Sequence, residues 1–346
     1  MTIEPSAGSQ SPLIESPVKV AVLMGGIGEE RDISLQSGSC VAQVLKEAGL
    51  DVVTSDVGPD NLDILEDSSI DVFFLALHGR FGEDGQLQQI LEDKSLRYTG
   101  SGPRACRLAL DKMASKKAFA KAGILTPVAI EFKPNADPAK LEKQLKQFAD
   151  RYVVKPITQG SSIGVSIANN RREAIAAAFN CFSEFGDCMI EELIPGRDIT
   201  VGILCDQALP IIELRTQSGF YDYHAKYFDE QTEFLFDTID NPVLTAKIKT
   251  AALDCFNALG CRHFARVDFR LDNDGDAYAL ELNAIPGFTT RSDLPKAAAR
   301  TGLSMSDLCI KIIEAALRRH SFGASATLKN KKTKYPSRDP ARREPK

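Results

Sequence analysis

The sequence predicts an α/β protein of three modules, in which a parallel α/β module is followed by two α+β modules. Strands and helices alternate over residues 18–111, as in a parallel sheet covered by helices. Farther along, two β-hairpins stand among helices, one around a glycine-rich loop at 152–167 and one around an Asp-Gly turn at 264–283. At 346 residues and 43% hydrophobic, the chain can build two or three compact cores.

The first module, 18–111, opens on a buried strand, because residues 18–24 read Val-Lys-Val-Ala-Val-Leu-Met. A glycine turn and a helix over about 34–48 follow, and Gly49 ends that helix. Short apolar runs at 52–53 and 72–77 supply further strands.

The second module is expected over 112–196 and the third over 197–320. The second holds helices at 112–122, 138–151 and 171–185, with paired strands at 152–155 and 165–167. The third holds a helix at 242–259, which has a proline near its start and a glycine after its end, then the 264–283 hairpin and a helix at 306–319.

Charge is distributed unevenly along the chain. Of the formal net charge of −5, residues 321–346 contribute +6 and residues 1–17 contribute −2, which leaves −9 for the body. An acidic body argues against nucleic acid as a partner. Both tails are expected to be disordered; the basic one is most simply solvated, with a polyanion-binding arm as the alternative.

The chain lacks the sequence signals of a membrane or secreted protein. No run reaches the roughly 18 apolar residues of a membrane span, and residues 1–17 have neither the basic start nor the apolar core of a signal peptide. The eight cysteines are scattered without a Cys-x-x-Cys pair, which favours buried free thiols over a zinc site or disulfides. We expect a cytoplasmic protein with no membrane partner.

The 264–283 hairpin carries acidic side chains on facing strands. A two-residue Asp-Gly loop at 274–275 sets Asp268 opposite Glu281 and Arg266 opposite Asn283. Because side chains alternate along a strand, these four share one face, and the other face is apolar, with Val267, Phe269, Leu280 and Leu282.

Directly opposed carboxylates repel each other, so a cation is expected between Asp268 and Glu281. Two carboxylates and an amide oxygen suit Mg²⁺ that is shared with phosphates. The alternative is a solvated acidic face beside Arg270.

Two glycine-rich segments are candidates for ligand binding. In Gly-Gly-Ile-Gly-Glu-Glu-Arg at 25–31, Arg31 replaces the third glycine of a dinucleotide fingerprint. Glu30 there either complements a helix dipole, the simpler explanation, or holds a substrate ammonium group. In Lys-Pro-Ile-Thr-Gln-Gly-Ser-Ser-Ile-Gly at 155–164, small residues and Lys155 suit phosphate; a flexible hairpin tip is the alternative.

Two further segments complete the candidate site. Residues 219–227 combine four aromatic side chains with a lysine, which suits a lid that excludes water, although a packed edge strand is an equal alternative. His78 lies where a buried strand opens into a glycine loop, and we expect it to organise the backbone there.

Together these segments closely resemble the D-alanine–D-alanine ligases of the ATP-grasp superfamily, from about residue 18 to about residue 316. The motifs keep the family's order. They are Leu-Met-Gly-Gly-x-x-x-Glu-Arg at 23–31, Ala-Leu-His-Gly-Arg-x-Gly-Glu-Asp-Gly at 76–85, Tyr-Thr-Gly-Ser-Gly at 98–102, Asp-Lys at 111–112, Lys-Pro-x-x-x-Gly-Ser-Ser-x-Gly at 155–164, Tyr-Asp-Tyr-x-Ala-Lys-Tyr at 221–227 and Glu-x-Asn-x-x-Pro-Gly-Phe-Thr at 281–289.

The resemblance implies a three-domain ATP-grasp ligase whose two α+β lobes sandwich ATP. It implies two Mg²⁺ ions, with Mn²⁺ as a substitute, on Asp268, Glu281 and Asn283. The ATP-binding residues that it implies are Lys112, Lys155, Ser162, Glu191, Glu192, Ile194, Asp198 and Lys226.

The resemblance also implies how two D-alanines are held. Glu30 binds the ammonium group of the first and is linked to Ser161 and Tyr227, while Ser292 helps to bind the carboxylate of the second. The developing oxyanion faces Arg266 and the backbone N–H of Gly287.

The activity implied is the ATP-dependent joining of two D-alanines through D-alanyl phosphate, by a homodimer, for peptidoglycan precursors. The alternatives are an ATP-grasp ligase with another acceptor (D-lactate, D-serine or an L-amino acid) and a non-catalytic ATP-binding switch. In this family, Tyr227 accompanies D-alanine as acceptor rather than D-lactate. The departures from the family pattern are Asp198 for a ribose-binding glutamate, Ala284 and Ile285 for small hydroxyl residues, and Arg291 for an uncharged residue.

Overall fold

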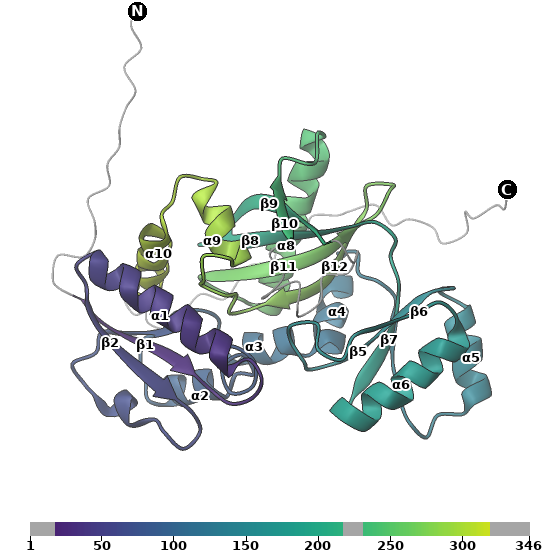
Figure 1. Cartoon of the computed structure of the whole chain (residues 1–346), viewed down its shortest axis with the longest axis horizontal. Helices are drawn as coiled ribbons and strands as arrows, with labels where there is room; N and C mark the ends of the chain where they lie inside the picture. Colours follow the sequence, from purple (N-terminus) through teal and green to yellow (C-terminus); the bar gives the residue numbers. More distant parts are fainter. Residues whose placement is uncertain (1–17, 217–230, 319–346) are drawn as a thin grey trace, which may run out of the picture.

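The structure is a computed structural model that describes residues 18–216 and 231–318. The described strands form sheets of three, four and five strands. In Figure 1 the five-stranded sheet lies between the N-terminal sheet on one side and the four-stranded lobe on the other. None of the described helices is long and apolar enough to cross a membrane.

The N-terminal part is a parallel sheet in the order β2-β1-β3. All four residues of β3 are buried, as are six of the seven residues of β1, as expected for parallel strands covered on both faces. Its elements are β1 (Lys19–Gly25), α1 (Arg31–Glu47), β2 (Asp51–Val57), the 3₁₀ helix η1 (Asp63–Glu66), β3 (Val72–Leu75), α2 (Gln86–Asp93) and α3 (Pro103–Leu110).

The central lobe is an antiparallel sheet in the order β4-β7-β5-β6 with its own apolar core. The predicted pairing of strands around the glycine-rich loop is confirmed, since Val153 pairs with Ile167. The elements are α4 (Lys112–Lys121), β4 (Ala129–Glu131), α5 (Pro138–Lys146), β5 (Tyr152–Pro156), β6 (Ser166–Ala168), α6 (Arg171–Phe185) and β7 (Cys188–Glu192).

The C-terminal part is an antiparallel sheet in the order β10-β9-β8-β11-β12. Helices α9 and α10 share one apolar core with α1 and the N-terminal sheet, which fixes the first and last parts of the chain against each other. The elements are β8 (Arg197–Leu204), β9 (Gln207–Arg215), β10 (Glu233–Phe236), α8 (Pro242–Leu259), β11 (Phe264–Leu271), β12 (Ala277–Asn283), α9 (Asp293–Ala299) and α10 (Met305–Arg318).

Some predicted boundaries are wrong. The helix expected over 138–151 ends at Lys146, where the Tyr152 hydroxyl donates a hydrogen bond to the Leu145 carbonyl (3.1 Å) and so satisfies a helix-end acceptor. The helix expected from residue 34 begins at Arg31. Helices α2, α3 and α9 were not predicted, because each has only seven or eight residues and so little periodicity.

The predicted two-residue turn of the β11–β12 hairpin is also wrong. Leu271 pairs with Ala277, and residues 272–276 form the loop, closed by a bond from the Asp272 N–H to the Asp276 carbonyl (3.0 Å). A β-bulge between Asp268 and Phe269 restores the register, so Asp268 does face Glu281 as predicted.

The bulge changes which of two neighbouring side chains of β12 faces the core. Ala279 is fully buried in the core, whereas Leu280, expected there, lines a cavity on the other face. The backbone of Ala279 bonds outside the hairpin, its N–H to the Leu125 carbonyl and its carbonyl to the Thr126 hydroxyl, both at 2.8 Å. These bonds account for the departure from regular pairing.

Candidate active site

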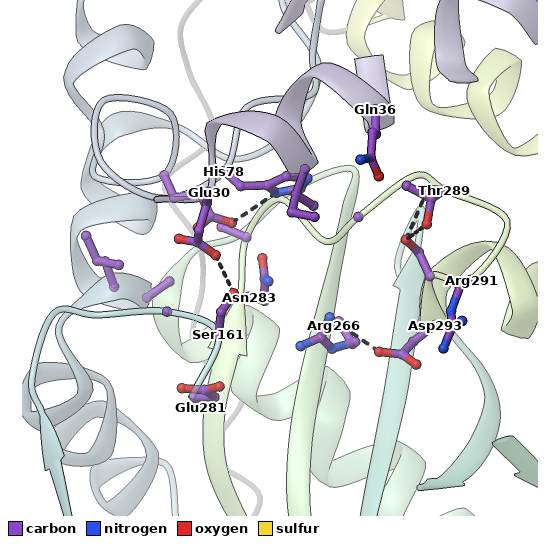
Figure 2. Close-up of a pocket in the computed structure, with 18 of the residues that line it drawn as sticks. Glu30, Gln36, His78, Ser161, Arg266, Glu281, Asn283, Thr289, Arg291 and Asp293 are labelled. Carbon is purple, nitrogen blue, oxygen red and sulfur yellow. Dashed lines mark hydrogen bonds and ion pairs between the residues drawn. The ribbon is translucent and has the colours of Figure 1, made fainter. Parts of the chain in front are cut away.

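A cavity of about 570 Å³ opens where the N-terminal part meets the C-terminal sheet (Figure 2). We call it the substrate cavity. Helix α1, the 156–164 loop, strands β11 and β12 and the 284–293 segment all contribute to its wall. Predicted site residues that line it are Glu30, His78, Lys112, Ser161, Arg266, Glu281, Asn283, Gly287 and Ser292.

Glu30 precedes α1, is 8% exposed and makes no side-chain capping bond to that helix. Its carboxylate instead accepts a short hydrogen bond from the Ser161 hydroxyl (Figure 2). Ser161 and Ser162 both have positive φ, +53° and +60°, an uncommon conformation for residues other than glycine. The 156–164 loop is therefore held against Glu30.

The acidic hairpin face forms the floor of the cavity. The Arg266 guanidinium donates to both oxygens of Asp268, at 2.9 and 2.8 Å, and the Thr200 hydroxyl donates to the same carboxylate at 2.6 Å. Glu281 lies 3.1 Å from the Lys112 ammonium group. Cations of the protein thus neutralise both opposed carboxylates.

The set Asp268, Glu281 and Asn283 has the right chemistry for Mg²⁺. In the described part of the chain no three Asp, Glu, His or Cys side chains form a metal-binding group, but this set consists of two carboxylates and an amide. The Asn283 amide oxygen accepts one bond, from the Ile285 N–H (2.9 Å), which leaves a second lone pair for a cation. Hard oxygen donors with open positions fit a magnesium ion that also binds phosphate.

The far end of the cavity is built by the segment after β12. Gly287 lies close to Ser292, since a Cβ at Gly287 would be 2.6 Å from the Ser292 hydroxyl oxygen. That oxygen accepts a bond from the Thr289 N–H at 3.0 Å. Asp293, the next residue, lies 3.5 Å from Arg266. A hydroxyl, a carboxylate and a guanidinium therefore lie close together here.

His78 is buried and connects two parts of the cavity wall. Its Nε2 lies 3.0 Å from the Ser37 hydroxyl of α1, and its Nδ1 lies 3.0 Å from the Ile285 carbonyl. The Ser37 hydroxyl also accepts a bond from the Phe288 N–H (3.3 Å). These contacts join α1 to the segment after β12, and the organising role of His78 stays a prediction.

A second cavity, of about 140 Å³, lies between the central lobe and the C-terminal sheet. We call it the nucleotide cavity. It shares Lys112, Gln159 and Glu281 with the substrate cavity, so the two adjoin at the acidic hairpin. Predicted ATP-binding residues that line it are Lys112, Lys155, Ser162, Glu191, Glu192, Ile194 and Asp198.

Glu191 is buried between two lysines. Its oxygens lie 2.8 Å from Lys155 and 2.5 Å from Lys116. Burial opposes the charge of Glu191, but the two lysines outweigh burial and hold its pKa below the usual value. Burial in turn lowers the pKa of Lys116 to about 8, although Glu191 favours its charged form. Sequence reasoning missed Lys116, which is one helical turn after Lys112 on α4.

Asp198 forms an ion pair with Arg270 at 2.6 Å, and Arg270 also donates to the Ile194 carbonyl at 3.0 Å. The shorter side chain at position 198 is therefore tied to the β11 strand at the rim of the nucleotide cavity. Lys226 and Tyr227, predicted for ATP and for the first substrate, lie outside the described residues.

Comparisons with known proteins agree with this geometry. Residues 119–314 match the family described as D-ala D-ala ligase C-terminus, and residues 60–101 match D-ala D-ala ligase N-terminus. The D-alanine–D-alanine ligase of Syntrophotalea carbinolica is 41% identical over 301 residues, which are 87% of this chain and 97% of that protein. That of Geotalea uraniireducens is 40% identical over 298 residues, which are 86% and 95%.

Solved structures are similar over nearly the same length. A D-alanine–D-alanine ligase from Bacillus anthracis complexed with ATP superposes with a TM-score of 0.77 at 33% identity, over 88% of this chain and 99% of that one. The VanG D-Ala:D-Ser ligase from Enterococcus faecalis superposes with a TM-score of 0.74 at 27% identity, over 87% and 100%. The predicted ATP-grasp fold is thereby confirmed, and the chain belongs to the D-alanine–D-alanine ligase family.

Proposed function

We propose that this protein joins two D-alanines into D-alanyl-D-alanine with the conversion of ATP to ADP and phosphate, in the synthesis of peptidoglycan precursors. One observation carries the proposal: the substrate and nucleotide cavities meet at Lys112, Gln159 and the carboxylate Glu281. A phosphoryl group passing from one cavity to the other would cross this acidic hairpin. Membership of the ligase family supports the same reaction.

ATP is proposed to lie in the nucleotide cavity between the 112–196 and 197–320 modules. Its adenine lies along the 191–194 segment and its phosphates lie near Lys112, Lys155 and Ser162, which line that cavity. The family resemblance adds Lys226, which is outside the described residues. Asp198, already paired with Arg270, lies where the ribose hydroxyls are expected. Asp268, Glu281 and Asn283 would hold Mg²⁺, or Mn²⁺ in its place, which would supply charge stabilisation of the transferring phosphoryl group.

The first D-alanine is proposed to bind with its ammonium group on Glu30, where Ser161 and Tyr227 complete the contact. Its carboxylate then points toward the acidic hairpin and the γ-phosphate. A carboxylate is a poor electrophile, and phosphorylation converts it into an acyl phosphate with a good leaving group. Residues 219–227 and the 156–164 loop are proposed to exclude water, which would hydrolyse this intermediate.

The second D-alanine attacks the acyl phosphate carbonyl through its amine. The free amine forms the C–N bond first, and the negative charge that this places on the former carbonyl oxygen faces Arg266 and the Gly287 N–H. The tetrahedral intermediate then collapses: the bond to phosphate breaks, and the proton of the attacking nitrogen leaves with the phosphate. One preorganised donor of this kind is typically worth about 2.7 to 4 kcal/mol. Ser292 helps to hold the carboxylate of this acceptor.

We infer a cytoplasmic homodimer that acts on small molecules, with neither nucleic acid nor a membrane as partner. The acidic body of the chain supports the exclusion of nucleic acid. Another acceptor is the second candidate function, because Arg291 adds a cation to the acceptor end of the substrate cavity.

The test is ADP release by the purified protein with Mg-ATP and D-alanine, with the product identified by mass. L-alanine alone, and D-alanine with D-lactate or D-serine, serve as comparisons. We expect D-alanyl-D-alanine from D-alanine alone. In Glu30→Gln, loss of a charge-assisted hydrogen bond is expected to raise the KM of the first D-alanine roughly 10- to 100-fold.

Glu29→Gln is the matched control, since Glu29 is an exposed carboxylate in the same turn and should leave this KM unchanged. Product formed only with another acceptor would overturn the choice of acceptor. Tight ATP binding without ADP release, with any combination of donor and acceptor, would overturn the proposal that the protein is an enzyme and would favour a switch protein.

A further inference from the structure

The acceptor end of the substrate cavity contains a buried carboxylate with no role in the reaction described above. Asp293 is the first residue of α9, is only 6% exposed and lines the cavity. One of its oxygens lies 3.5 Å from the Arg266 guanidinium (Figure 2). An acid in the first turn of a helix contributes only about 0.3 to 1 kcal/mol when exposed, so the helix end alone does not explain a buried one.

The other carboxylates that line this cavity make contacts elsewhere in its wall. Glu30 is bonded to Ser161, and Glu281 lies beside Lys112 in the proposed metal set. Glu83 accepts a bond from the Gly79 N–H (2.9 Å) behind His78. In Figure 2, Glu30 and Asp293 lie on opposite sides of the cavity. A reaction that joins two amino acids brings two ammonium groups into this space, one on each side.

We propose that Asp293 is a specificity-determining residue that binds the amino group of the acceptor. The inference deepens the proposed function and rests on it, because it presumes an acceptor that attacks beside Arg266. It assigns the acceptor class as amino acids, which carry a hydrogen-bond donor and a positive charge, against 2-hydroxy acids, which lack that charge.

The position of the reacting atoms supports this assignment. In the tetrahedral intermediate, the oxyanion and the attacking nitrogen are bonded to the same carbon. The oxyanion faces Arg266, and Asp293 is in contact with that guanidinium. The acceptor carboxylate is held at Ser292, the residue just before Asp293. The attacking nitrogen lies between these two fixed points, within reach of the Asp293 carboxylate.

The charges at this end match an amino-acid zwitterion. Arg291, Ser292 and Asp293 are consecutive in the sequence and all line the cavity, so a cation, a hydroxyl and an anion are present at this end. Lys296 is affected by both charges. Burial lowers the pKa of Lys296, Asp293 raises it and Arg291 lowers it. An acceptor with carboxylate toward Arg291 and ammonium toward Asp293 satisfies both. With a hydroxy acid bound, Asp293 would have no ammonium partner.

The test uses Asp293→Asn, which keeps the shape and removes the charge. Donor KM and acceptor KM are separated from the biphasic dependence of rate on D-alanine, and the partition between peptide and ester is measured with D-alanine and D-lactate in competition. We expect the acceptor KM to rise roughly 10- to 100-fold while the donor KM stays unchanged. The ester-to-peptide ratio should rise by a similar factor.

Two further variants control for structure. Asp293→Glu retains the charge and should retain the preference for an amine. Asp307→Asn removes an acid from the first turn of α10, outside both cavities, and should leave both KM values and the partition unchanged.

An equal loss of rate with D-alanine and with D-lactate as acceptor, or a changed donor KM, would mean that Asp293 only supports Arg266. Either result would overturn the proposal. An Asp293→Asn variant that loses only D-serine as acceptor would place Asp293 against the acceptor side chain and would overturn it too. Failure of the proposed function is distinct, because the unaltered protein would then form no D-alanyl-D-alanine.

Discussion

Gly287 lies where the site leaves no room for a side chain. Its backbone faces the proposed oxyanion, and a methyl group added to it would lie 2.6 Å from the Ser292 hydroxyl oxygen and 3.4 Å from the Ser292 Cβ. We predict that Gly287→Ala displaces one of the two residues and lowers kcat/KM by about 10²- to 10³-fold, the effect of losing an oxyanion donor.

The matched control is Gly58→Ala, since a Cβ at Gly58 meets no atom within 4 Å. Steady-state kinetics and thermal unfolding of both variants are the measurements. Near-normal activity in Gly287→Ala would show that this backbone N–H is not needed, and a large loss of stability would assign the effect to folding instead.

His263 is one residue through which stability depends on pH. Burial, with a smaller contribution from Arg262, lowers its pKa from 6.5 to about 4. Its Nδ1 accepts a bond from the Gly100 N–H (3.1 Å), which ties the start of β11 to the N-terminal part. The folded state therefore holds a neutral imidazole, whereas the unfolded chain takes up a proton below pH 6.5.

We predict that stability falls as pH decreases from 6.5 toward 4. Through this group alone, the free energy of unfolding should be about 2 kcal/mol lower at pH 5 than at pH 7. Urea unfolding at the two pH values, for the unaltered protein and for His263→Gln, measures the difference. Glutamine can accept the same bond but does not titrate, so an equal pH dependence in both proteins would contradict this assignment.

At the scale of elements, the β11–β12 hairpin determines which side chains face the nucleotide. Because of the bulge, Leu280 lines the nucleotide cavity and Ala279 lies in the core. We predict that Leu280→Ala raises the KM for ATP roughly tenfold, since apolar contact with the base is lost, and changes stability little.

The contrasting variant is Ala279→Leu, which overfills a fully buried position and should destabilise the fold by about 1 to 3 kcal/mol. ATP kinetics and chemical unfolding distinguish the two. If Leu280→Ala instead destabilised the protein by about 2 to 5 kcal/mol, as truncation of a core leucine does, the bulge would be misplaced.

The same hairpin shows what sequence reasoning can and cannot reach. An assumed two-residue Asp-Gly turn set Asp268 opposite Glu281, and this pairing is confirmed although the turn is not, because the bulge offsets the longer loop. The turn and the face of the hairpin on which Leu280 lies could not be predicted in this way. Hydrogen bonds between Ala279 and both Leu125 and Thr126, more than 150 residues away, alter the pairing of β12. Lys116 and Asp293 were missed for the same reason, since their partners Glu191 and Arg266 are distant in sequence.

At the scale of the whole molecule, three sheets bring remote segments to one place. The N-terminal part supplies Glu30, the central lobe supplies the 156–164 loop, and the C-terminal sheet supplies the acidic hairpin. The order of the motifs predicted this family and its fold. How closely the parts pack was not predictable, because the core shared by α1, α9 and α10 depends on contacts between the two ends of the body.

The central claim is that the two adjoining cavities activate a substrate carboxylate with the γ-phosphate of ATP. The most direct measurement uses D-alanine labelled with ¹⁸O in its carboxylate, with Mg-ATP, and follows the label by ³¹P NMR and mass spectrometry. An acyl phosphate intermediate predicts that one labelled oxygen moves from D-alanine to the released phosphate for each dipeptide formed. Phosphate released without label would contradict the account.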